Sequence, residues 1–387
     1  MELIEYRFDE VTINFDKKRV PLSGAQREKR QGEYRYYGAQ GVIDHIDDFI
    51  FDGTYLLIAE DGENLKSKKQ NIAQVVEGQF WVNNHAHIVQ GNELCNTRYL
   101  CYLLNSMDLS GYITGSAQPK LSQANLNAVI LLLPPIHVQD KIVEYLYMLD
   151  RKITINQQIN DNLQQQAQTI YKSLFLAYDS TPTSKFYASE LGQIPVGWTV
   201  KSLSEVTTSI RTKVKDNNYK VFSAINTGQL QLSEEYFTKQ VFSKNICNYI
   251  VVEPFDFAYN PARVNIGSIG MNDFGYTGCV SPIYVVVRPE PEYQYFLDFF
   301  IKTKPFCEEV KARASGSVRQ SLSYTDFGQI KVVYPPIEVI RQFNREYEVR
   351  LRAMKQLKDE SKKLALIRDA LLPKLMSDEI DVSAIQL

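Results

Sequence analysis

Two long stretches with the same spacing of hydrophobic positions dominate the chain. The first, residues 134–178, follows an apolar run and a pair of prolines, and its inward positions recur at alternating steps of four and three. These positions are Ile142, Leu146, Leu149, Ile153, Asn156, Asn160, Leu163, Ala167, Ile170 and Leu174. Such a heptad seam is typical of a helix that packs along another helix. The pattern predicts a helix of about forty residues, roughly 60 Å long.

A second stretch, residues 335–376, supplies a partner for the first. It begins with the same Pro-Pro-Ile sequence and continues as a second helical seam. The seam positions are Phe343, Tyr347, Arg350, Met354, Leu357, Ser361, Leu364, Arg368 and Leu371. Proline lacks a backbone N–H and clashes with the preceding turn, so Pro373 predicts a break or kink. We expect the two helices to pair in antiparallel fashion, with Asn156 and Asn160 controlling register and orientation.

The two stretches belong to a larger internal repeat. Residues 115–136, GSAQPKLSQANLNAVILLLPPI, align without a gap with residues 316–337, GSVRQSLSYTDFGQIKVVYPPI, at an offset of 201. Two shorter segments upstream repeat as well, residues 98–104 with 294–300 and residues 6–11 with 201–206. The chain is therefore interpreted as one unit of about 200 residues that is present twice.

The repeat predicts an α+β protein with two similar domains in tandem. Two long antiparallel α-helices that form a coiled coil are expected to separate the domains, and a pseudo-two-fold axis is expected to relate the halves. The predicted divisions are a first globular domain at residues 1–134, the first long helix at 135–178, a linker at 179–199, a second globular domain at 200–335, and the second long helix with the C-terminal tail at 336–387.

Within the globular domains, short hydrophobic runs and turn residues predict strands followed by a helix. In the first domain a buried strand that runs into an Asp-Gly loop is expected at residues 55–65, a second strand at 79–89, and a helix at 97–107. In the second domain the strands are expected at 255–261 and 279–287, and one helix at about 292–310.

Composition and cysteine usage narrow the class of protein. The chain has 387 residues, of which 44% are hydrophobic and 23% charged, which is typical of a soluble globular protein. No apolar run is long enough to cross a membrane, and the N-terminus carries charges where a signal peptide is apolar. Five cysteines without a Cys-x-x-Cys pair indicate a reduced, cytoplasmic chain without a structural zinc site.

Basic residues gather locally, although the net charge of −2 alone argues against a nucleic-acid partner. The clusters and the polar residues beside them give these candidate DNA-binding residues: Arg27, Lys29, Arg30, Lys66, Lys68, Lys69, Ser116, Gln118, Lys120, Arg211, Lys213, Lys215, Arg263, Asn265, Lys311, Arg313, Ser317, Arg319 and Gln320. For any one cluster, an ordinary solvated surface is the alternative interpretation. Their recurrence in loops of both repeats favours contacts to phosphates and bases.

Three sequence patterns resemble catalytic or metal sites. Asn260-Pro261-Ala262-Arg263 lacks the second proline and the aromatic residue of adenine methyltransferases, and no glycine-rich loop accompanies it. His85-Ala86-His87 has a spacing that metals accept, but no further ligand pair completes a site, so structural histidines are favoured. Glu309-Val310-Lys311 with Asp298 imitates a nuclease carboxylate set, but it falls on an expected helix. We therefore predict no catalytic residue and no metal site.

The first long helix has an unusual outer surface. From Ile153 to Tyr171 its only charged residue is Asp161, while glutamine and asparagine fill most outward positions. A helix face in water usually carries lysine and glutamate, so a neutral polar face indicates coverage by another protein. A glutamine-rich helix that simply faces water is the alternative.

These features together resemble a known family. Two variable α+β domains, each ending in Gly-Ser-x-x-x-x-Leu-Ser, an apolar strand, Pro-Pro-Ile and a long helix, resemble the specificity subunit of type I restriction–modification systems. Residues 134–175 resemble the family's central conserved region, and residues 335–382 resemble its distal one. Residues 192–206, GQIPVGWTVKSLSEV, resemble the usual opening of a target-recognition domain, whereas the first domain begins at MELIEYRF without that opening.

The resemblance implies a function and a set of partners. Each globular domain would be a target-recognition domain for one half of a split, asymmetric site on double-stranded DNA. The helices would set the spacing and dock two methyltransferase subunits, which bring S-adenosylmethionine, and restriction and translocation subunits would add ATP- and Mg-dependent activity. No cofactor and no catalysis would belong to this chain. A duplicated coiled-coil scaffold without DNA reading, or a self-contained DNA methyltransferase or nuclease, are the alternatives.

Overall fold

The computed structural model describes residues 3–67, 70–115, 118–179, 185–216, 218–237, 241–314, 321–377 and 379–380. The chain divides into two compact units. Unit 1 takes the residues up to Gln158 and those from Leu357 onward, and unit 2 takes Ile159–Gln356. Each unit therefore contains one globular domain and a part of each long helix.

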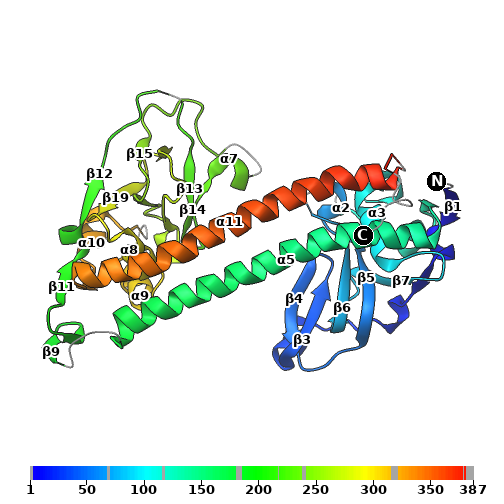
Figure 1. Ribbon diagram of the computed structural model, residues 1–387, viewed down its shortest axis with the longest axis horizontal. Coiled ribbons are helices and arrows are strands. Elements are labelled where there is room, and N and C mark those ends of the chain that lie inside the picture. The colour runs from blue at the N-terminus through cyan, green and yellow to red at the C-terminus, as the bar shows by residue number, and fades with distance from the viewer. Residues whose placement is uncertain are drawn as a thin grey trace. The chain divides into compact units, whose positions relative to one another are not determined.

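A six-stranded sheet forms the centre of the first domain (Figure 1). Its strands, in spatial order, are β2 (Thr12–Asn14), β7 (Ala86–Gly91), β5 (Phe51–Ala59), β6 (Ala73–Val82), β3 (Gln31–Gly38) and β4 (Gly41–Ile46). The pairing of β3 with β6 is parallel, and the other pairings are antiparallel. The single strand expected at residues 79–89 is wrong. Asn83 accepts a hydrogen bond from the His85 N–H at 2.8 Å, and this local turn separates β6 from β7.

Short elements surround this sheet and connect it to the first long helix. They are η1 (Phe8–Glu10), η2 (Asp16–Lys18), α1 (Gly24–Glu28), α2 (Asn64–Ser67), α3 (Thr97–Ser106), η3 (Ser110–Tyr112) and α4 (Gln123–Asn127). Asn96 caps α3 by accepting hydrogen bonds from two backbone N–H groups, so this helix lies within the range that the sequence predicts. Strand β1 (Ile4–Arg7) pairs with β8 (Ile130–Leu133), and β8 ends at the two prolines.

The second domain is built on a four-stranded antiparallel sheet. Its strands, in spatial order, are β12 (Thr207–Ile210), β19 (Val285–Pro289), β16 (Phe257–Tyr259) and β17 (Ile269–Met271). Four strand pairs accompany it: β9 (Phe186–Ser189) with β10 (Gly192–Pro195), β11 (Thr199–Ser202) with β20 (Lys331–Tyr334), β13 (Phe222–Ile225) with β14 (Gln229–Leu232), and β15 (Ile250–Val252) with β18 (Gly278–Val280). The β9–β10 hairpin lies in the predicted linker.

The helices of the second domain correct one prediction. They are α6 (Leu203–Val206), α7 (Ser233–Tyr236), η5 (Val264–Ile266), α8 (Gln294–Phe300), α9 (Lys304–Arg313) and α10 (Tyr324–Gly328). The single helix expected at 292–310 is wrong, because the chain breaks between α8 and α9. Thr303 is the N-cap of α9 and Pro305 stands in its first turn, which is where a new helix starts rather than where an old one continues.

The internal repeat is confirmed in the strand order. The strands β2-β7-β5-β6 of the first domain correspond to β12-β19-β16-β17 of the second, and β1–β8 corresponds to β11–β20. Equivalent buried pairs include Phe8 with Leu203, Tyr99 with Tyr295, Leu103 with Phe299, Leu121 with Leu322, and Leu126 with Phe327. Even a small cap recurs, because Glu10 accepts from the Arg7 N–H and Glu205 accepts from the Ser202 N–H, both at 2.7 Å. The two domains share one framework and differ in what is added to it.

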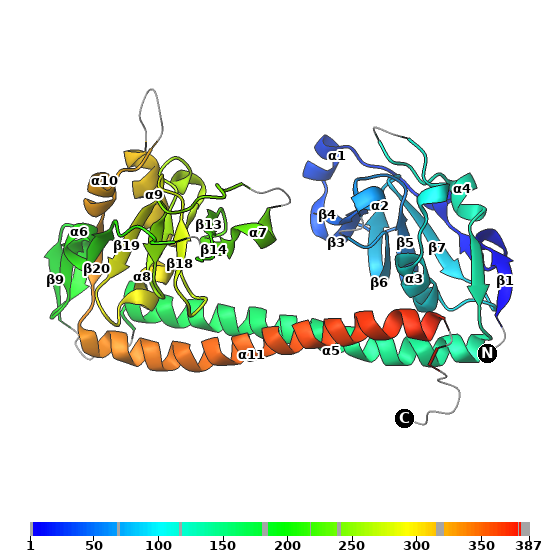
Figure 2. The same ribbon diagram turned by 90° about the horizontal axis from the view of Figure 1, so that it is seen from above.

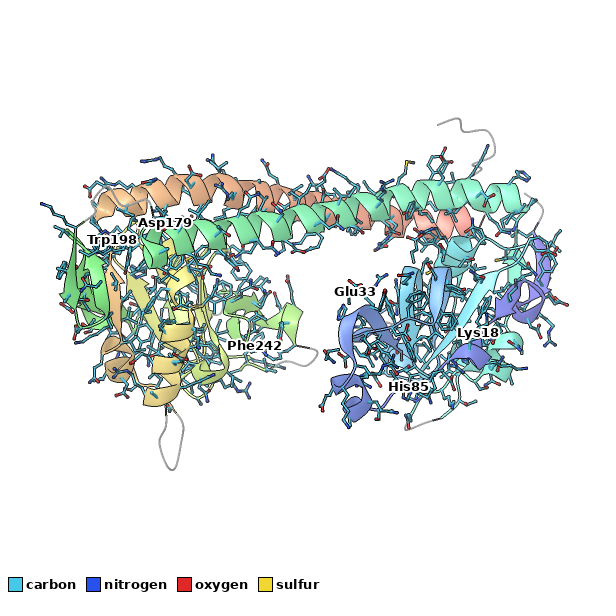
Figure 3. All side chains as sticks on the ribbon, turned by 90° about the horizontal axis from the view of Figure 1, so that it is seen from below. Lys18, Glu33, His85, Asp179, Trp198 and Phe242 are labelled. Atoms are coloured by element: carbon cyan, nitrogen blue, oxygen red, sulfur yellow. The ribbon has the colours of Figure 1, made fainter. Side chains whose placement is uncertain are left out.

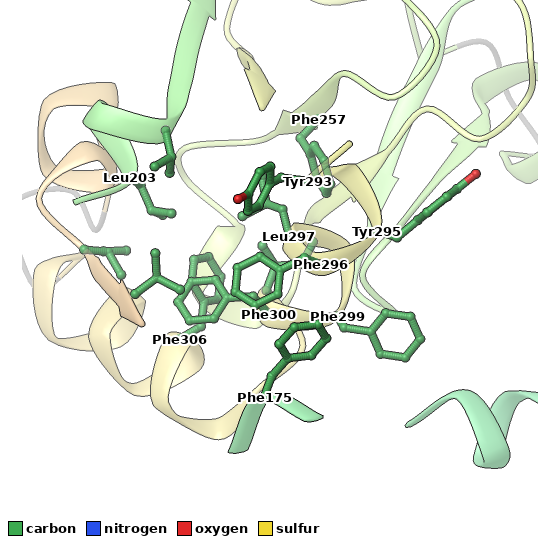
Figure 4. Packing of buried hydrophobic residues seen from close by; sticks show 14 of the residues in the cluster. Phe175, Leu203, Phe257, Tyr293, Tyr295, Phe296, Leu297, Phe299, Phe300 and Phe306 are labelled. Atoms are coloured by element: carbon green, nitrogen blue, oxygen red, sulfur yellow. The ribbon is translucent and has the colours of Figure 1, made fainter. Parts of the chain in front are cut away.

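Aromatic side chains fill the core where the second domain meets its part of the long helices (Figure 4). Phe296 and Phe300 of α8 and Phe306 of α9 are buried. Phe175 from the first long helix lies with its ring centre 5.0 Å from that of Phe296 and 5.2 Å from that of Phe343. Each buried phenylalanine stabilises such a core by about 1.5–3 kcal/mol relative to an exposed one. The helices are therefore part of the hydrophobic core of unit 2.

The two long helices, α5 (Ile136–Lys172) and α11 (Ile337–Met376), begin directly after the two Pro-Pro pairs, as predicted. A π-helical turn, Ser173–Ala177, ends α5. Contacts in unit 1 join Asp150 to Arg368, and contacts in unit 2 join Tyr171 to Phe343. From the first contact to the second, the residue number increases along α5 and decreases along α11, so the two helices pair in antiparallel fashion. The break expected at Pro373 is not found, because α11 continues for three further residues, to Met376.

The seam positions that the sequence predicts are shielded from solvent on both helices. Every seam position is buried or partly buried, and none is exposed. Asn156 is completely buried, and its side-chain N–H₂ group donates to Glu360 Oε2 at 2.8 Å and to Ser361 Oγ at 3.3 Å. A buried amide that finds partners at one position of the opposite helix disfavours shifted pairings. This supports the predicted role of Asn156 in setting the register.

Asp150 makes a further polar contact between the helices. From this contact we predict an effect on stability. Its carboxylate accepts hydrogen bonds from the Tyr102 hydroxyl of α3 and from Arg368 Nη1, the latter at 2.7 Å. Asp150→Ala is expected to lower the free energy of unfolding by about 1–3 kcal/mol, because charged hydrogen bonds are lost. Lys152→Ala is the control, since its ammonium lies 3.5 Å from Glu360 with both side chains nearly half exposed, and it is expected to cost ~0.5 kcal/mol. Urea unfolding measures both variants, and equal losses contradict the prediction.

Candidate nucleic-acid interface

Three loops of the first domain meet on the side away from the long helices. We call residues 60–67, 83–85, 114–115 and 118–121 the first loop cluster. The Leu121 N–H donates to the Glu60 carbonyl at 2.8 Å, the Lys120 ammonium lies 3.2 Å from Glu60 Oε1, and the His85 ring lies 2.7 Å from Asp61. Figure 3 shows His85 on this side of the domain. The cluster brings together the predicted residues Lys66, Gln118 and Lys120, which are all exposed.

Gly115 explains why a glycine opens the repeated loop. Its φ is +85°, a left-handed conformation that favours glycine. A Cβ atom there would stand 2.2 Å from the Gln118 carbonyl oxygen, which is a severe clash. The loop therefore depends on glycine to bring its two sides together. The predicted residues Lys68, Lys69 and Ser116 lie outside the described residues.

Charged side chains lie beneath the first loop cluster. His87 is almost completely buried, with Nδ1 2.6 Å from Asp16 Oδ2 and Nε2 2.8 Å from the Leu121 carbonyl oxygen. Arg19 donates to Glu60 Oε2 at 3.0 Å and lies 3.3 Å from Asp16. Burial raises the pKa of the Asp16 carboxyl, but hydrogen bonds from His87 and Ile88 and the charge of Arg19 outweigh burial and hold that pKa below its ordinary value.

The other predicted residues of the first domain lie at a separate place, around α1, which is also on the side away from the long helices (Figure 2). Arg27 donates to Asp44 at 2.9 Å and Arg30 donates to Asp47 at 2.8 Å, while Lys29 is exposed. The guanidinium groups of Arg27 and Arg30 also lie over the rings of Tyr36 and Trp81. Both arginines are thus held by neighbouring carboxylates and aromatic rings.

A corresponding loop cluster exists in the second domain. We call residues 260–266, 311–314 and 321–322 the second loop cluster. The Leu322 N–H donates to the Pro261 carbonyl at 3.0 Å, which repeats the bond between Leu121 and Glu60. Arg263 and Lys311 are exposed, Asn265 is partly buried, and Arg313 donates to Glu309 at 3.0 Å. The predicted residues Ser317, Arg319 and Gln320 lie outside the described residues.

Arg211, Lys213 and Lys215 occupy a different part of the second domain, in the segment that follows β12. All three are exposed, and the Lys213 ammonium donates to Asn248 Oδ1 at 3.1 Å. The predicted basic residues therefore form two groups in each domain. One group is the loop cluster that both repeats share, and the other is specific to each domain.

The matched loops carry different side chains. The offset of 201 places Glu60 opposite Pro261, Gly62 opposite Arg263, and Lys120 opposite Ser321. Base recognition depends on side chains that reach the edges of the bases, so two such loops are suited to different sequences. The two halves therefore share a backbone framework but carry different side chains at the matched loop positions.

The patterns that resemble catalytic sites have local structural roles. Asn260 closes a turn, because its side-chain oxygen accepts from the Ala262 N–H at 3.1 Å and its carbonyl accepts from the Arg263 N–H at 3.0 Å. His85 and His87 each contact a different carboxylate, Asp61 and Asp16. Asp298 pairs with Lys302 at 2.8 Å, and burial raises the pKa of the Asp298 carboxyl. Within the described ranges, no group of three His, Cys, Asp or Glu side chains is placed to hold a metal ion.

Sequence reasoning missed the buried charges behind the first loop cluster. The sequence gives no signal for Asp16 and Arg19, and it favours a structural role for His87 without showing its partners. The available signal was the position of His87 in an alternating strand, where every second residue faces inward. An inward-facing histidine needs hydrogen-bond partners, and Asp16 and Leu121 supply them.

Outside the loops, the outward surface of α5 keeps apolar side chains among its amides. Met148 and Ile155 in unit 1 are 46% and 38% exposed, and Ile159 in unit 2 is 41% exposed. Leu176, in the π-helical turn that follows α5, is 52% exposed. Among the residues that the structure describes, no helix is long and apolar enough to span a membrane.

Comparison with known proteins connects this geometry to a family. The family model described as "Type I restriction modification DNA specificity domain" matches residues 5–165. A putative type I restriction enzyme specificity subunit, S.HindORF215P of Haemophilus influenzae, is 35% identical over 36% of this chain, and the match spans only 35% of that protein. The type I restriction enzyme HindI specificity subunit of the same species is 23% identical over 85% of this chain and 84% of its own length.

A solved structure also resembles this chain in its fold. The crystal structure of a type I restriction–modification system S subunit from M. genitalium superposes with a TM-score of 0.61 at 14% identity, covering 97% of this chain and 96% of that one. At this level of identity the superposition shows that the two chains share a fold. The repeat, the fold and the family match agree: residues 5–165 match the type I restriction–modification DNA specificity model, and the chain as a whole is similar to type I specificity subunits.

Proposed function

We propose that this chain reads a bipartite, asymmetric DNA target, with one half-site for each globular domain. One observation supports this most directly: the two domains share a four-strand framework and a matched loop cluster, whose exposed residues differ. Equivalent frameworks suit two similar tasks, and different loop residues suit two different sequences. Lys66 and Lys120 in the first loop cluster and Arg263 and Lys311 in the second are proposed to approach the DNA.

The long helices are proposed to set the distance between the half-sites and to dock two methyltransferase subunits. The exposed apolar and amide side chains of α5 support docking, because such a surface is better suited to a protein partner than to water. S-adenosylmethionine would enter with those subunits, and ATP and Mg²⁺ with restriction and translocation subunits. This chain would supply recognition and no catalytic group.

The test is co-expression of the full chain with its methyltransferase subunit, followed by mapping of methylated positions on plasmid DNA. We expect a single split site with two different half-sequences. The chain purified alone is expected to transfer no methyl group from labelled S-adenosylmethionine and to cut no DNA. Methyl transfer by the chain alone, or methylation without sequence preference in the complex, contradicts the proposal.

A further inference from the structure

We propose that His87 is a positioning residue for the first half-site, an inference that rests on the proposed function. His87 lies on β7, under the first loop cluster, and it is 1% exposed. It does not reach the surface, so it acts on DNA only through the loop that it holds. The described part of that loop, residues 118–121, contains Lys120, which is proposed to approach DNA, and the exposed Gln118.

Both ring nitrogens of His87 have a partner. Nδ1 lies 2.6 Å from Asp16 Oδ2, and Nε2 lies 2.8 Å from the Leu121 carbonyl oxygen. Asp16 is held in turn, because it accepts from the Ile88 N–H at 2.8 Å and lies 3.3 Å from Arg19. The imidazole ring therefore connects the loop at Leu121 to η2 at Asp16.

Charged side chains connect His87 to the same segment by a second route. Asp16 lies in η2, and Glu60, directly after β5, lies 3.9 Å from Nδ1. Arg19 lies 3.3 Å from Asp16 Oδ2 and donates to Glu60 Oε2 at 3.0 Å, and the Lys120 ammonium lies 3.2 Å from Glu60 Oε1. Leu121 is thus held by His87 directly, and Lys120 is held through Glu60.

The second domain has a valine where the first has His87, so the inference applies to the first half-site alone. In the strand ladders Ile58 pairs with His87, and the equivalent Tyr259 pairs with Val285. The bond from Leu121 to the Glu60 carbonyl has its counterpart in the second domain, but valine cannot donate a side-chain hydrogen bond. Loss of the His87 contact should therefore affect the first half-site alone.

The experiment uses the full chain in complex with its methyltransferase subunit and compares His87→Gln with the wild type. Glutamine fills a similar volume, but its amide oxygen cannot donate, so one of the two contacts is lost. We expect about tenfold weaker binding to the mapped target. Methylation should become tolerant of changes in the first half-site and stay strict in the second. Hydrogen exchange should rise in residues 114–121 and stay unchanged in β5 and β7.

Two further variants separate positioning from general damage. Asp16→Asn removes the charge that orients His87 and should relax the same half-site. Gln90→Ala changes another side chain of β7, whose amide donates to the Thr54 carbonyl at 2.8 Å, and should leave both half-sites strict. Unchanged affinity and specificity in His87→Gln, equal relaxation of both half-sites, or exchange that spreads through the sheet overturns the inference. A wild-type complex without sequence preference overturns the proposed function instead.

Discussion

Residues 1–180, produced without the rest of the chain and assembled with the methyltransferase subunit, are expected to dimerise and to direct methylation to a new symmetric site. The fragment contains one full repeat, and α5 lacks its partner α11. Two copies can replace that partner with each other, because both seams follow the same heptad pattern. Two identical readers related by a two-fold axis require a palindromic target with two copies of the first half-site.

The contacts of the intact chain support this exchange of partners. Asn156 contacts Ser361, and the offset of 201 makes Ser361 the equivalent of Asn160. In the dimer, Asn156 should therefore face Asn160 of the second copy, where two amides can bond each other. Leu375, which is buried in the core of unit 1, is the equivalent of Leu174. The second copy thus offers a leucine for the same place.

A polar contact that the fragment dimer cannot replace provides a matched variant. Arg368 is the equivalent of Ala167, so Asp150 loses its arginine in the fragment dimer. Ala167→Arg in the fragment should restore that pair and raise the dimer's free energy of unfolding by about 1–2 kcal/mol. The mass of the fragment and its methylation sites on a plasmid are the measurements. A monomeric fragment, or methylation at the original asymmetric site, contradicts the model of two readers on two helices.

The repeated framework was predictable because the same residue types recur at equivalent positions in the two halves of the chain. Glycine at 115, the serine caps at 122 and 323, and the Pro-Pro-Ile segments each have a local physical role that sequence alone reveals. The seams were equally predictable, since the apolar residues on one face of a helix recur at steps of three and four in the sequence. Together these features fixed the positions of β8, β20, α5 and α11.

Features that depend on contacts across the fold were not visible. The break between α8 and α9 places Pro305 in a first turn, but a short apolar run on either side of it looks like one helix. Arg27 and Arg30 look like free cations in the sequence, and only the fold brings Asp44 and Asp47 to them. The role of His87 likewise needs Asp16 and Leu121, which are 71 and 34 residues away.

Neutralising the proposed DNA contacts is expected to abolish most binding and to flatten its dependence on salt. The eight residues are Lys66, Lys68, Lys69, Lys120, Arg211, Lys213, Arg263 and Arg319. Each phosphate contact releases condensed counterions, so each lost contact should reduce the slope of log K against log salt by about one unit. The measurement is DNA affinity of the assembled complex at several salt concentrations. Lys304→Gln is the control, because this lysine is 85% exposed at the start of α9, and its slope should not change.

Single substitutions should divide these residues by the kind of contact they make. A lysine that binds phosphate should weaken all sequences equally, whereas an arginine that reads a base should cost ~1–3 kcal/mol and relax one position. Arg27 and Arg30 should have smaller effects than Arg263, because their carboxylate partners must first be displaced. Arg263 is exposed in the second loop cluster, so Arg263→Ala is the most informative change. If affinity and salt slope stay unchanged after replacement of all eight residues, the assignment of these residues as DNA contacts is wrong.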